Sequence, residues 1–284
     1  MKPQHILLPT DFSANAQNAI DYAIYLFEEI ECTFHILNSF EINAPGHIAT
    51  NKTKKPSLAH TLAHESQQNI QQIVSQLMAN NKNPLHGFNG ISISDSLINA
   101  IGSTTINKDV DYIFMGTKGY SAAKEVFMGS NTIKVLKHIN FCPIIAVPEG
   151  YYYALPDKIA FATNFEHEYK KVELMPLTEL AKLWNSKIDI IHINKGKKLI
   201  QEQERYKKLL NERFFELSHK FIEIEGHSKI SDAIMSYTKD HKAVGMIAMV
   251  NYWHSFFEKL IKENVIKRVA FYTEVPFLVF PLID

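Results

Sequence analysis

The second half of the chain repeats landmarks of the first half in the same order. The segment Ile-Leu-Leu-Pro-Thr-Asp-Phe at 6–12 recurs at 159–165 as Ile-Ala-Phe-Ala-Thr-Asn-Phe. The run at 34–38 recurs at 191–194, with His35 matched to His192, and the run at 142–148 recurs at 275–281. Three landmarks in one order indicate a duplicated domain. We therefore expect two domains, residues 1–150 and 151–284, joined by a linker at 151–156.

Short apolar runs alternate with helical periodicity in each half, which predicts βαβ crossovers and parallel sheets. In the stretch 13–30 the apolar positions recur at spacings of three and four, as a helix with one buried face requires, and Ser13 is its expected N-cap. We expect strands at 4–9, 32–38, 84–91, 110–115 and 143–147 with helices at 13–30, 57–82, 94–107 and 129–140. The second half predicts strands at 158–163, 187–193, 219–225, 243–249 and 277–280.

Composition excludes several classes of function. Thirty basic residues balance thirty acidic ones, so no global charge draws the chain to nucleic acid or an anionic membrane. No apolar run approaches the roughly 18–20 residues that cross a bilayer, and the N-terminus has no apolar stretch of signal-peptide length. Cys32 and Cys142 each lie in an apolar run, which favours buried thiols in a reducing compartment. We expect a cytoplasmic protein.

Three segments of the first half end predicted strands at one edge of the sheet. Residues 9–11 follow the first strand, residues 36–38 end the second, and Gly116 ends the fourth. Ligands of doubly wound folds bind in the crevice at the carboxyl ends of such strands. The irregular segment 41–56 also follows this edge, and it is either a surface loop or a lid over a ligand.

The glycines near this edge have the chemistry of a phosphate site. Gly116 and Gly119 allow close approach of the backbone, and Gly129 opens a predicted helix whose free N–H groups favour an anion. The hydroxyls of Ser130 and Thr132 add donors. Glycine spacing alone leaves another interpretation open, because a turn needs glycine for its own conformation and Gly129 can serve as a helix cap.

The same residues resemble a known motif. Met115-Gly116-Thr117-Lys118-Gly119, nine further residues and Gly129-Ser130 resemble the ATP-binding motif Gly-x-x-Gly-x9-Gly-Ser/Thr of the universal stress protein family. The segments 6–13 and 142–147 are similar to the first and last strands of that family. The resemblance covers the whole chain as a tandem pair. It implies two doubly wound, five-stranded, parallel-sheet α/β domains of Rossmann-like, adenine nucleotide alpha hydrolase-like type.

Carried over residue by residue, the resemblance implies one ATP site in the first domain. The turn after the first strand lies against the nucleotide, the backbone at the end of the second strand contacts adenine, and the glycines and following residues hold ribose and phosphates. Asn131 departs from the usual small apolar residue, and Lys118 either faces the phosphates or points to solvent. Asp11 is the carboxylate placed to help hold Mg²⁺. The implied site is Pro9, Thr10, Asp11, Ile36, Gly116, Lys118, Gly119, Gly129, Ser130, Asn131 and Thr132.

The second half departs from the motif. Aligned on the last strand, the three glycines become Met249, Tyr252 and Lys262, and the serine becomes Glu263. Side chains then occupy the space of a phosphate and a carboxylate repels it, so we expect no nucleotide there. The resemblance also implies that the domains pair through their last strands, 143–147 against 276–280, as an internal pseudo-dimer. Pairing of two chains into a homodimer stays open.

These features predict an ATP-binding stress-response regulator whose occupancy alters a partner surface. No nucleophile–base pair is recognisable, so chemistry beyond slow ATP hydrolysis is not expected. A nucleotide-using enzyme on a related fold is an alternative, although such ligases usually carry a Ser-Gly-Gly-rich turn where this chain has residues 9–13. A ligand-free interaction module is the third possibility.

Other candidates have simpler explanations. His60 and His64 have helical spacing for Zn²⁺ but no third ligand nearby, which favours a solvated helix face. His35 and His192 are expected to be hydrogen-bonded within the sheet. The aromatic run around Trp253 is either core or a partner surface.

Overall fold

The computed structural model describes residues 2–42, 58–117, 129–194, 196–225, 229–251 and 265–283, in which strands and helices alternate. The first half contains β1 (Gln4–Pro9), α1 (Ala14–Leu26), β2 (Cys32–Phe40), α2 (Leu58–Asn80), β3 (His86–Ser94), α3 (Leu97–Asn107), β4 (Tyr112–Gly116), α4 (Ser130–His138) and β5 (Ile144–Val147). The second half contains β6 (Lys158–Ala162), α5 (Lys171–Leu183), β7 (Lys187–Asn194), α6 (Gln201–Arg213), β8 (His219–Glu225), α7 (Ile230–Asp240), β9 (Val244–Asn251), α8 (Val265–Tyr272) and β10 (Phe277–Pro281).

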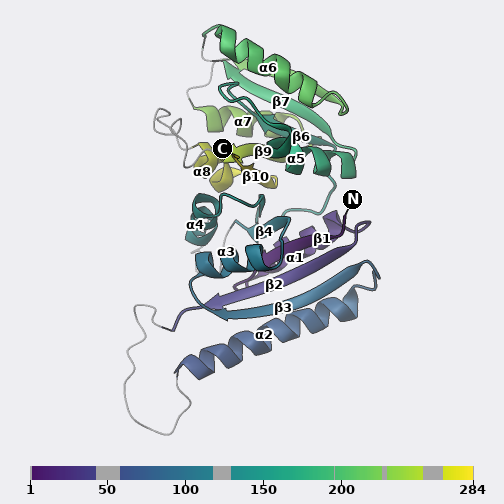
Figure 1. Cartoon of the computed structure of the whole chain (residues 1–284), viewed down its shortest axis with the longest axis vertical. Coiled ribbons are helices and arrows are strands. Elements are labelled where there is room, and N and C mark those ends of the chain that lie inside the picture. The colour runs from purple at the N-terminus through teal and green to yellow at the C-terminus, as the bar shows by residue number, and fades with distance from the viewer. Residues whose placement is uncertain are drawn as a thin grey trace.

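The strands form one ten-stranded sheet with the order β3-β2-β1-β4-β5-β10-β9-β6-β7-β8. Among the described strands, pairing is parallel within each half and antiparallel between β5 and β10, where Ile145 faces Leu278. The predicted pairing of the two last strands is therefore present. Figure 1 shows the result, an elongated molecule with α2 near one end of its long axis and α6 near the other.

Helices cover both faces of the sheet. Residues of α1, α2, α5 and α6 pack with Ile6 and Leu8 of β1 in one core that continues through both halves. Residues of α3, α4, α7 and α8 pack on the other face with Leu7. Because successive strand residues point to opposite faces, a sheet covered on both faces needs apolar residues at nearly every position. This explains the continuous apolar runs of β1, β4 and β5.

The two halves meet through equivalent residues. Phe27 and Trp184 are the C-caps of α1 and α5, and their rings lie 6.4 Å apart in an edge-to-face arrangement. The indole Nε1 of Trp184 also donates to the backbone oxygen of Leu26 at 2.9 Å. Contact between equivalent positions is the signature of an isologous interface, here formed within one chain.

The strand pairing corrects one part of the predicted repeat. Leu7 pairs with His35, while its counterpart Ala160 pairs with Asp189. Asp189 is therefore the structural counterpart of His35, and the match of His35 with His192 is wrong. An apolar strand looks much the same when shifted along its own sequence, so one shared histidine did not fix the alignment.

Candidate functional site

The turn after β1 is built by its own side chains. Thr10 Oγ1 accepts a hydrogen bond from Phe12 N at 3.0 Å, and Asp11 Oδ1 accepts one from Ser13 N at 3.1 Å. Phe12 has a φ of 64°, which these side-chain bonds stabilise. Ser13 is the N-cap of α1 and accepts from Ala16 N at 3.1 Å, as predicted. One oxygen of the exposed Asp11 carboxylate thus accepts a backbone hydrogen bond that stabilises the turn.

The second half repeats this turn. Thr163 Oγ1 accepts from Phe165 N at 3.1 Å, Asn164 Oδ1 accepts from Glu166 N at 3.1 Å, and Phe165 has a φ of 58°. The matched motifs at 6–12 and 159–165 therefore describe a shared turn. Its presence in both halves means that the turn alone does not identify a nucleotide site.

Gly116 ends β4, as predicted, and lies directly against the start of α1. A Cβ at this position would lie 2.5 Å from Asn15 Nδ2 and 2.8 Å from the Asn15 backbone oxygen. Only glycine allows this approach without displacing backbone. The contact was not predicted from the sequence, where Asn15 is one polar residue of a helix. It gives Gly116 a packing role as well as its predicted role at a ligand.

The start of α4 is tied to the end of β4. Gly129 N donates to the Thr117 oxygen at 2.7 Å, and Thr132 Oγ1 donates to the Gly116 oxygen at 2.8 Å. The N-termini of α1 and α4 therefore both lie at the end of β4. Neither helix has an acidic residue in its first turn. Free N–H groups and helix dipoles give this edge a positive partial charge that favours an anion.

The predicted phosphate-binding residues divide into three groups. Ser130 and Asn131 are exposed residues in the first turn of α4. Thr132 is only 2% exposed and its hydroxyl is bonded to Gly116, so the predicted contribution of this hydroxyl to a ligand is not supported. Lys118 and Gly119 lie outside the described residues.

The second strand extends beyond its predicted end. β2 continues to Phe40 because Ser39 and Phe40 pair with β3, so Ile36 does not end the strand and its side chain is buried in the core. Asn38 lies at the edge instead and donates from Nδ2 to the Thr10 oxygen at 2.7 Å. Asn38 fixes the end of β2 against the β1 turn, and its polarity within an apolar strand was the signal in the sequence.

Strand register also corrects the counterpart of Gly116. β4 pairs with β5 from Ile113 opposite Ile144, and β9 pairs with β10 from Ile247 opposite Phe277. This register matches Gly116 with Val250, not with Met249, because the intervening segments differ by one residue. The matched residue is a buried valine, so the corrected alignment also places no glycine at this position of the second half. Tyr252, Lys262 and Glu263 lie outside the described residues.

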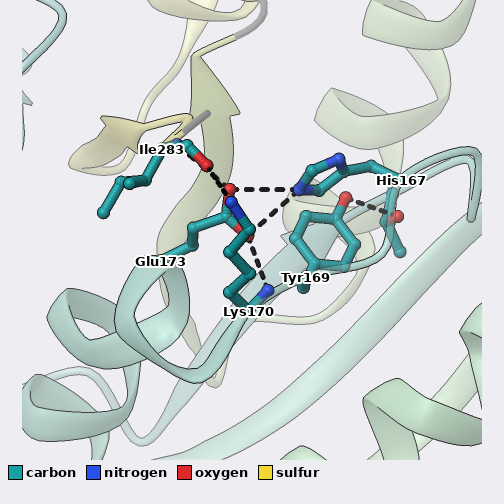
Figure 2. A network of polar contacts seen from close by, with 6 residues as sticks. His167, Tyr169, Lys170, Glu173 and Ile283 are labelled. Atoms are coloured by element: carbon teal, nitrogen blue, oxygen red, sulfur yellow. Dashed lines mark hydrogen bonds and ion pairs between the residues drawn. The ribbon is translucent and has the colours of Figure 1, made fainter.

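The start of α5 carries its own anion (Figure 2). Glu173 lies in the first turn of the helix, and its carboxylate accepts from Lys170 N at 2.6 Å and from Ile283 N at 3.0 Å. His167 Nε2 lies 3.0 Å from the same carboxylate. The side chain of Glu173 is buried, so a carboxylate of the chain occupies the helix end that has no acid in α1.

The remaining space at this turn is also filled. The hydroxyl of Tyr169 lies 2.8 Å from Thr163 Oγ1, and both residues are buried. Lys170 Nζ donates to the Ile283 oxygen at 2.9 Å, which holds the end of the chain over the helix (Figure 2). The start of α5 is therefore contacted by groups of the chain itself.

The histidines have the structural roles that were expected. His35 is buried, and its two ring nitrogens lie 3.0 Å from His5 Nδ1 and 3.3 Å from Asn89 Nδ2. Burial, with His5 alongside, lowers the pKa of His35 to about 4. His192 Nδ1 lies 3.1 Å from the Thr163 oxygen. Exposed His60 and His64 stack, and the described residues contain no group of three or more metal-ligating side chains.

The fold and this edge define a tandem Rossmann-like α/β protein. The family model described as the universal stress protein family matches residues 2–148, more than half of the chain. The chain therefore belongs to the universal stress protein family. A search of curated proteins gave no match. No helix among the described residues has the length and apolarity to cross a membrane.

Solved structures share the whole fold. A universal stress protein from Archaeoglobus fulgidus DSM 4304 has 15% identity and a TM-score of 0.70, with 98% of this chain and 96% of that chain covered. A putative universal stress protein from Pseudomonas aeruginosa UCBPP-PA14 has 12% identity, a TM-score of 0.61 and coverage of 98% and 93%. The cytoplasmic domain of a prokaryotic cation chloride cotransporter has 8% identity, a TM-score of 0.56 and coverage of 98% and 95%. At these identities the likeness shows the fold alone.

Proposed function

We propose that the first half binds one ATP at the edge formed by the β1 turn, the end of β4 and the start of α4. The chain then acts as a nucleotide-dependent interaction module in the stress response, with domains at 1–150 and 151–284. The observation that carries the proposal is the convergence of two helix N-termini without acidic residues on Gly116. Such an arrangement favours phosphate. Membership of the universal stress protein family supports the choice of an adenine nucleotide.

The expected contacts follow from the described geometry. The N–H groups of Ser130 and Asn131 and the Ser130 hydroxyl face the phosphates, and Thr132 holds α4 in place through Gly116. The exposed carboxylate of Asp11, in the turn after β1, is the oxygen ligand proposed for Mg²⁺ bound with the nucleotide. Lys118 and Gly119 complete the proposed site as the motif implies, and adenine packs near the β1 and β2 ends.

A charge placed at α4 tests the site without disturbing the fold. Ser130→Glu adds a carboxylate at an exposed position in the first turn of α4, where the charge interacts favourably with the helix dipole but repels phosphate. We expect ATP affinity to fall at least about tenfold in calorimetry while the melting temperature is kept. Ser96→Asp is the control, because it places the same charge at the N-cap of α3. Equal affinity of the Ser130→Glu variant and the parent would refute the site.

A ligand-free interaction module is the second candidate. Two observations favour it: the Thr132 hydroxyl is already bonded, and packing against Asn15 is a sufficient reason for Gly116. Failure of ATP, ADP and AMP to raise the melting temperature of the parent would select this candidate.

A further inference from the structure

A cavity of about 610 Å³ lies between α1 and the end of α2. It follows the later turns of α1, whereas the candidate nucleotide edge lies at the start of that helix, and the two sites share no lining residue. A volume of this size is typical of small-molecule sites. The cavity is therefore a candidate site that the proposed function does not use.

The lining combines an apolar floor with polar walls. Ile24, Ile73 and Leu77 supply apolar surface. Asp21 and Tyr25 lie on one face of α1 at a spacing of four, and Glu28 lines the groove from the turn after the helix. The facing wall is rich in carboxamides, which come from Gln76, Asn80, Asn81 and Asn83. Such a groove fits a ligand with an aliphatic chain and several N–H donors.

The carboxylates of Asp21 and Glu28 have no cationic partner in the described part of the chain. Asp21 is contacted by neutral groups, with Gln17 Nε2 at 2.8 Å and the Tyr153 hydroxyl at 3.5 Å. Burial raises the pKa of Asp21, which means that the site disfavours an uncompensated negative charge. Lys82 lines the groove without pairing with either acid, and His86 is turned toward the backbone oxygen of Phe27 at 3.0 Å.

The equivalent groove of the second half already contains an ammonium group. It lies between α5 and α6, with a volume of about 300 Å³, and Lys182 Nζ pairs there with Glu216 at 2.5 Å. Lys182 and Tyr25 occupy the same position, two residues before the C-caps of their helices. The second half thus supplies its own ammonium in this groove, whereas the first half presents an aromatic ring and two acids.

We propose that the α1–α2 groove of the first half binds an aliphatic polyamine, with ammonium groups at Asp21 and Glu28 and the methylene chain on the apolar floor. Asp21 lies on α1 and Glu28 in the turn that follows the helix, seven positions along the chain, so their backbones are on the order of 10 Å apart. An extended triamine spans this separation. The Tyr25 ring, which lies 6.2 Å from that of Tyr153, offers its free face to a cation. The proposal is independent of ATP binding.

Spermidine is the probe for the full-length, nucleotide-free protein at physiological salt. We expect one spermidine per chain in calorimetry, together with NMR shifts of the Ile24 and Ile73 methyl groups. Asp21→Asn and Glu28→Gln each remove one charge-assisted contact and should weaken binding about tenfold or more. Both substitutions keep side-chain shape, and Asn retains partners for Gln17 and Tyr153. Glu29→Gln is the matched control, because Glu29 is exposed beside the groove without lining it.

Two results together would support two specific contacts. The Glu29→Gln variant should bind spermidine as tightly as the parent, and the parent should bind n-butylamine, which has one ammonium group, more weakly than spermidine. Absence of spermidine binding to the parent overturns the proposal. An equal loss in Glu29→Gln also overturns it, since that result means general attraction to acidic surface. Binding that leaves the Ile24 and Ile73 methyl signals unchanged places spermidine elsewhere and rejects the groove.

Discussion

Gly116 at the end of β4 lies directly against Asn15 of α1. The neighbouring atoms include the Asn15 backbone oxygen, so a side chain at 116 cannot be accommodated by rotating Asn15 alone. At the residue scale, this glycine therefore allows α1 to pack against β4 and also lies at the proposed nucleotide site. A substitution here confounds binding with stability, which is why the charge at Ser130 is the better test of the site.

Gly116→Ala should lower the free energy of unfolding by about 2 kcal/mol or more, because the new methyl group overlaps α1. Urea unfolding measures this. Gly102→Ala is the control, since its Cβ would meet only Ile139 Cδ1 at 3.9 Å within helix α3. That substitution should stabilise the protein by roughly 0.5–1 kcal/mol. A neutral effect of Gly116→Ala would contradict the close contact.

His35 should make stability depend on pH. Its folded pKa is about 4 against an ordinary value of 6.5, so the unfolded chain binds a proton that the folded chain excludes. Stability is therefore fully present above about pH 6.5 and falls as the pH is lowered toward 4, with a slope of at most about 1.4 kcal/mol per pH unit. His35→Gln should flatten this slope in urea titrations, and His64→Gln, on an exposed helix face, should leave it unchanged.

At the element scale, the sequence predicted all ten strands at their approximate positions along the chain and placed the ends of β1 and β4 correctly. Those elements are predictable because their apolar patterns follow from burial on both faces. The end of β2 was not predictable, since Ser39 and Phe40 are extended only through pairing with β3. The match of His35 with His192 failed for a related reason: register depends on neighbouring strands, which local sequence does not record.

For the candidate site, the positions of residues along the chain were predictable, but their tertiary contacts were not. Residue spacing located Gly116, Gly129 and Ser130 at one edge, but the contact with Asn15 and the bonded state of the Thr132 hydroxyl depend on tertiary packing. The Glu173 network of the second half was missed as well. An acidic residue in the first turn of a helix is common, so Glu173 alone did not predict the network. The contact with Ile283 N is visible only in the structure.

Glu173→Ala should destabilise the protein by about 2–4 kcal/mol, because it leaves Lys170 N, Ile283 N and His167 without their buried acceptor. Thermal and urea unfolding measure the loss. Glu168→Ala is the control: its pairing with Arg205 at 3.7 Å is exposed, so the expected effect is below about 0.5 kcal/mol. Equal effects of the two substitutions would show that the network at α5 adds no stability.

At the scale of the whole molecule, the two halves share one sheet and one continuous core. The β5–β10 pairing and the Phe27–Trp184 contact join them as equivalent surfaces. We infer that the two halves stabilise each other.

Trp184→Ala should therefore destabilise the entire chain by about 3–5 kcal/mol, through lost packing on Phe27 and the lost bond to Leu26. Urea unfolding followed by NMR signals from both halves should show one shared transition for the parent. Phe215→Ala, at a ring that is 85% exposed, should have little effect. Loss of stability confined to the second half of the Trp184→Ala variant would argue against coupling across the junction.

The most direct test of the central claim is the stoichiometry of ATP binding to the full-length protein by calorimetry. In the first half neither α1 nor α4 has an acidic residue in its first turn, whereas the first turn of α5 in the second half contains the buried Glu173. The account therefore predicts one ATP per chain. Two ATP molecules per chain would contradict the assignment of the second half, and no binding would contradict the proposed site itself.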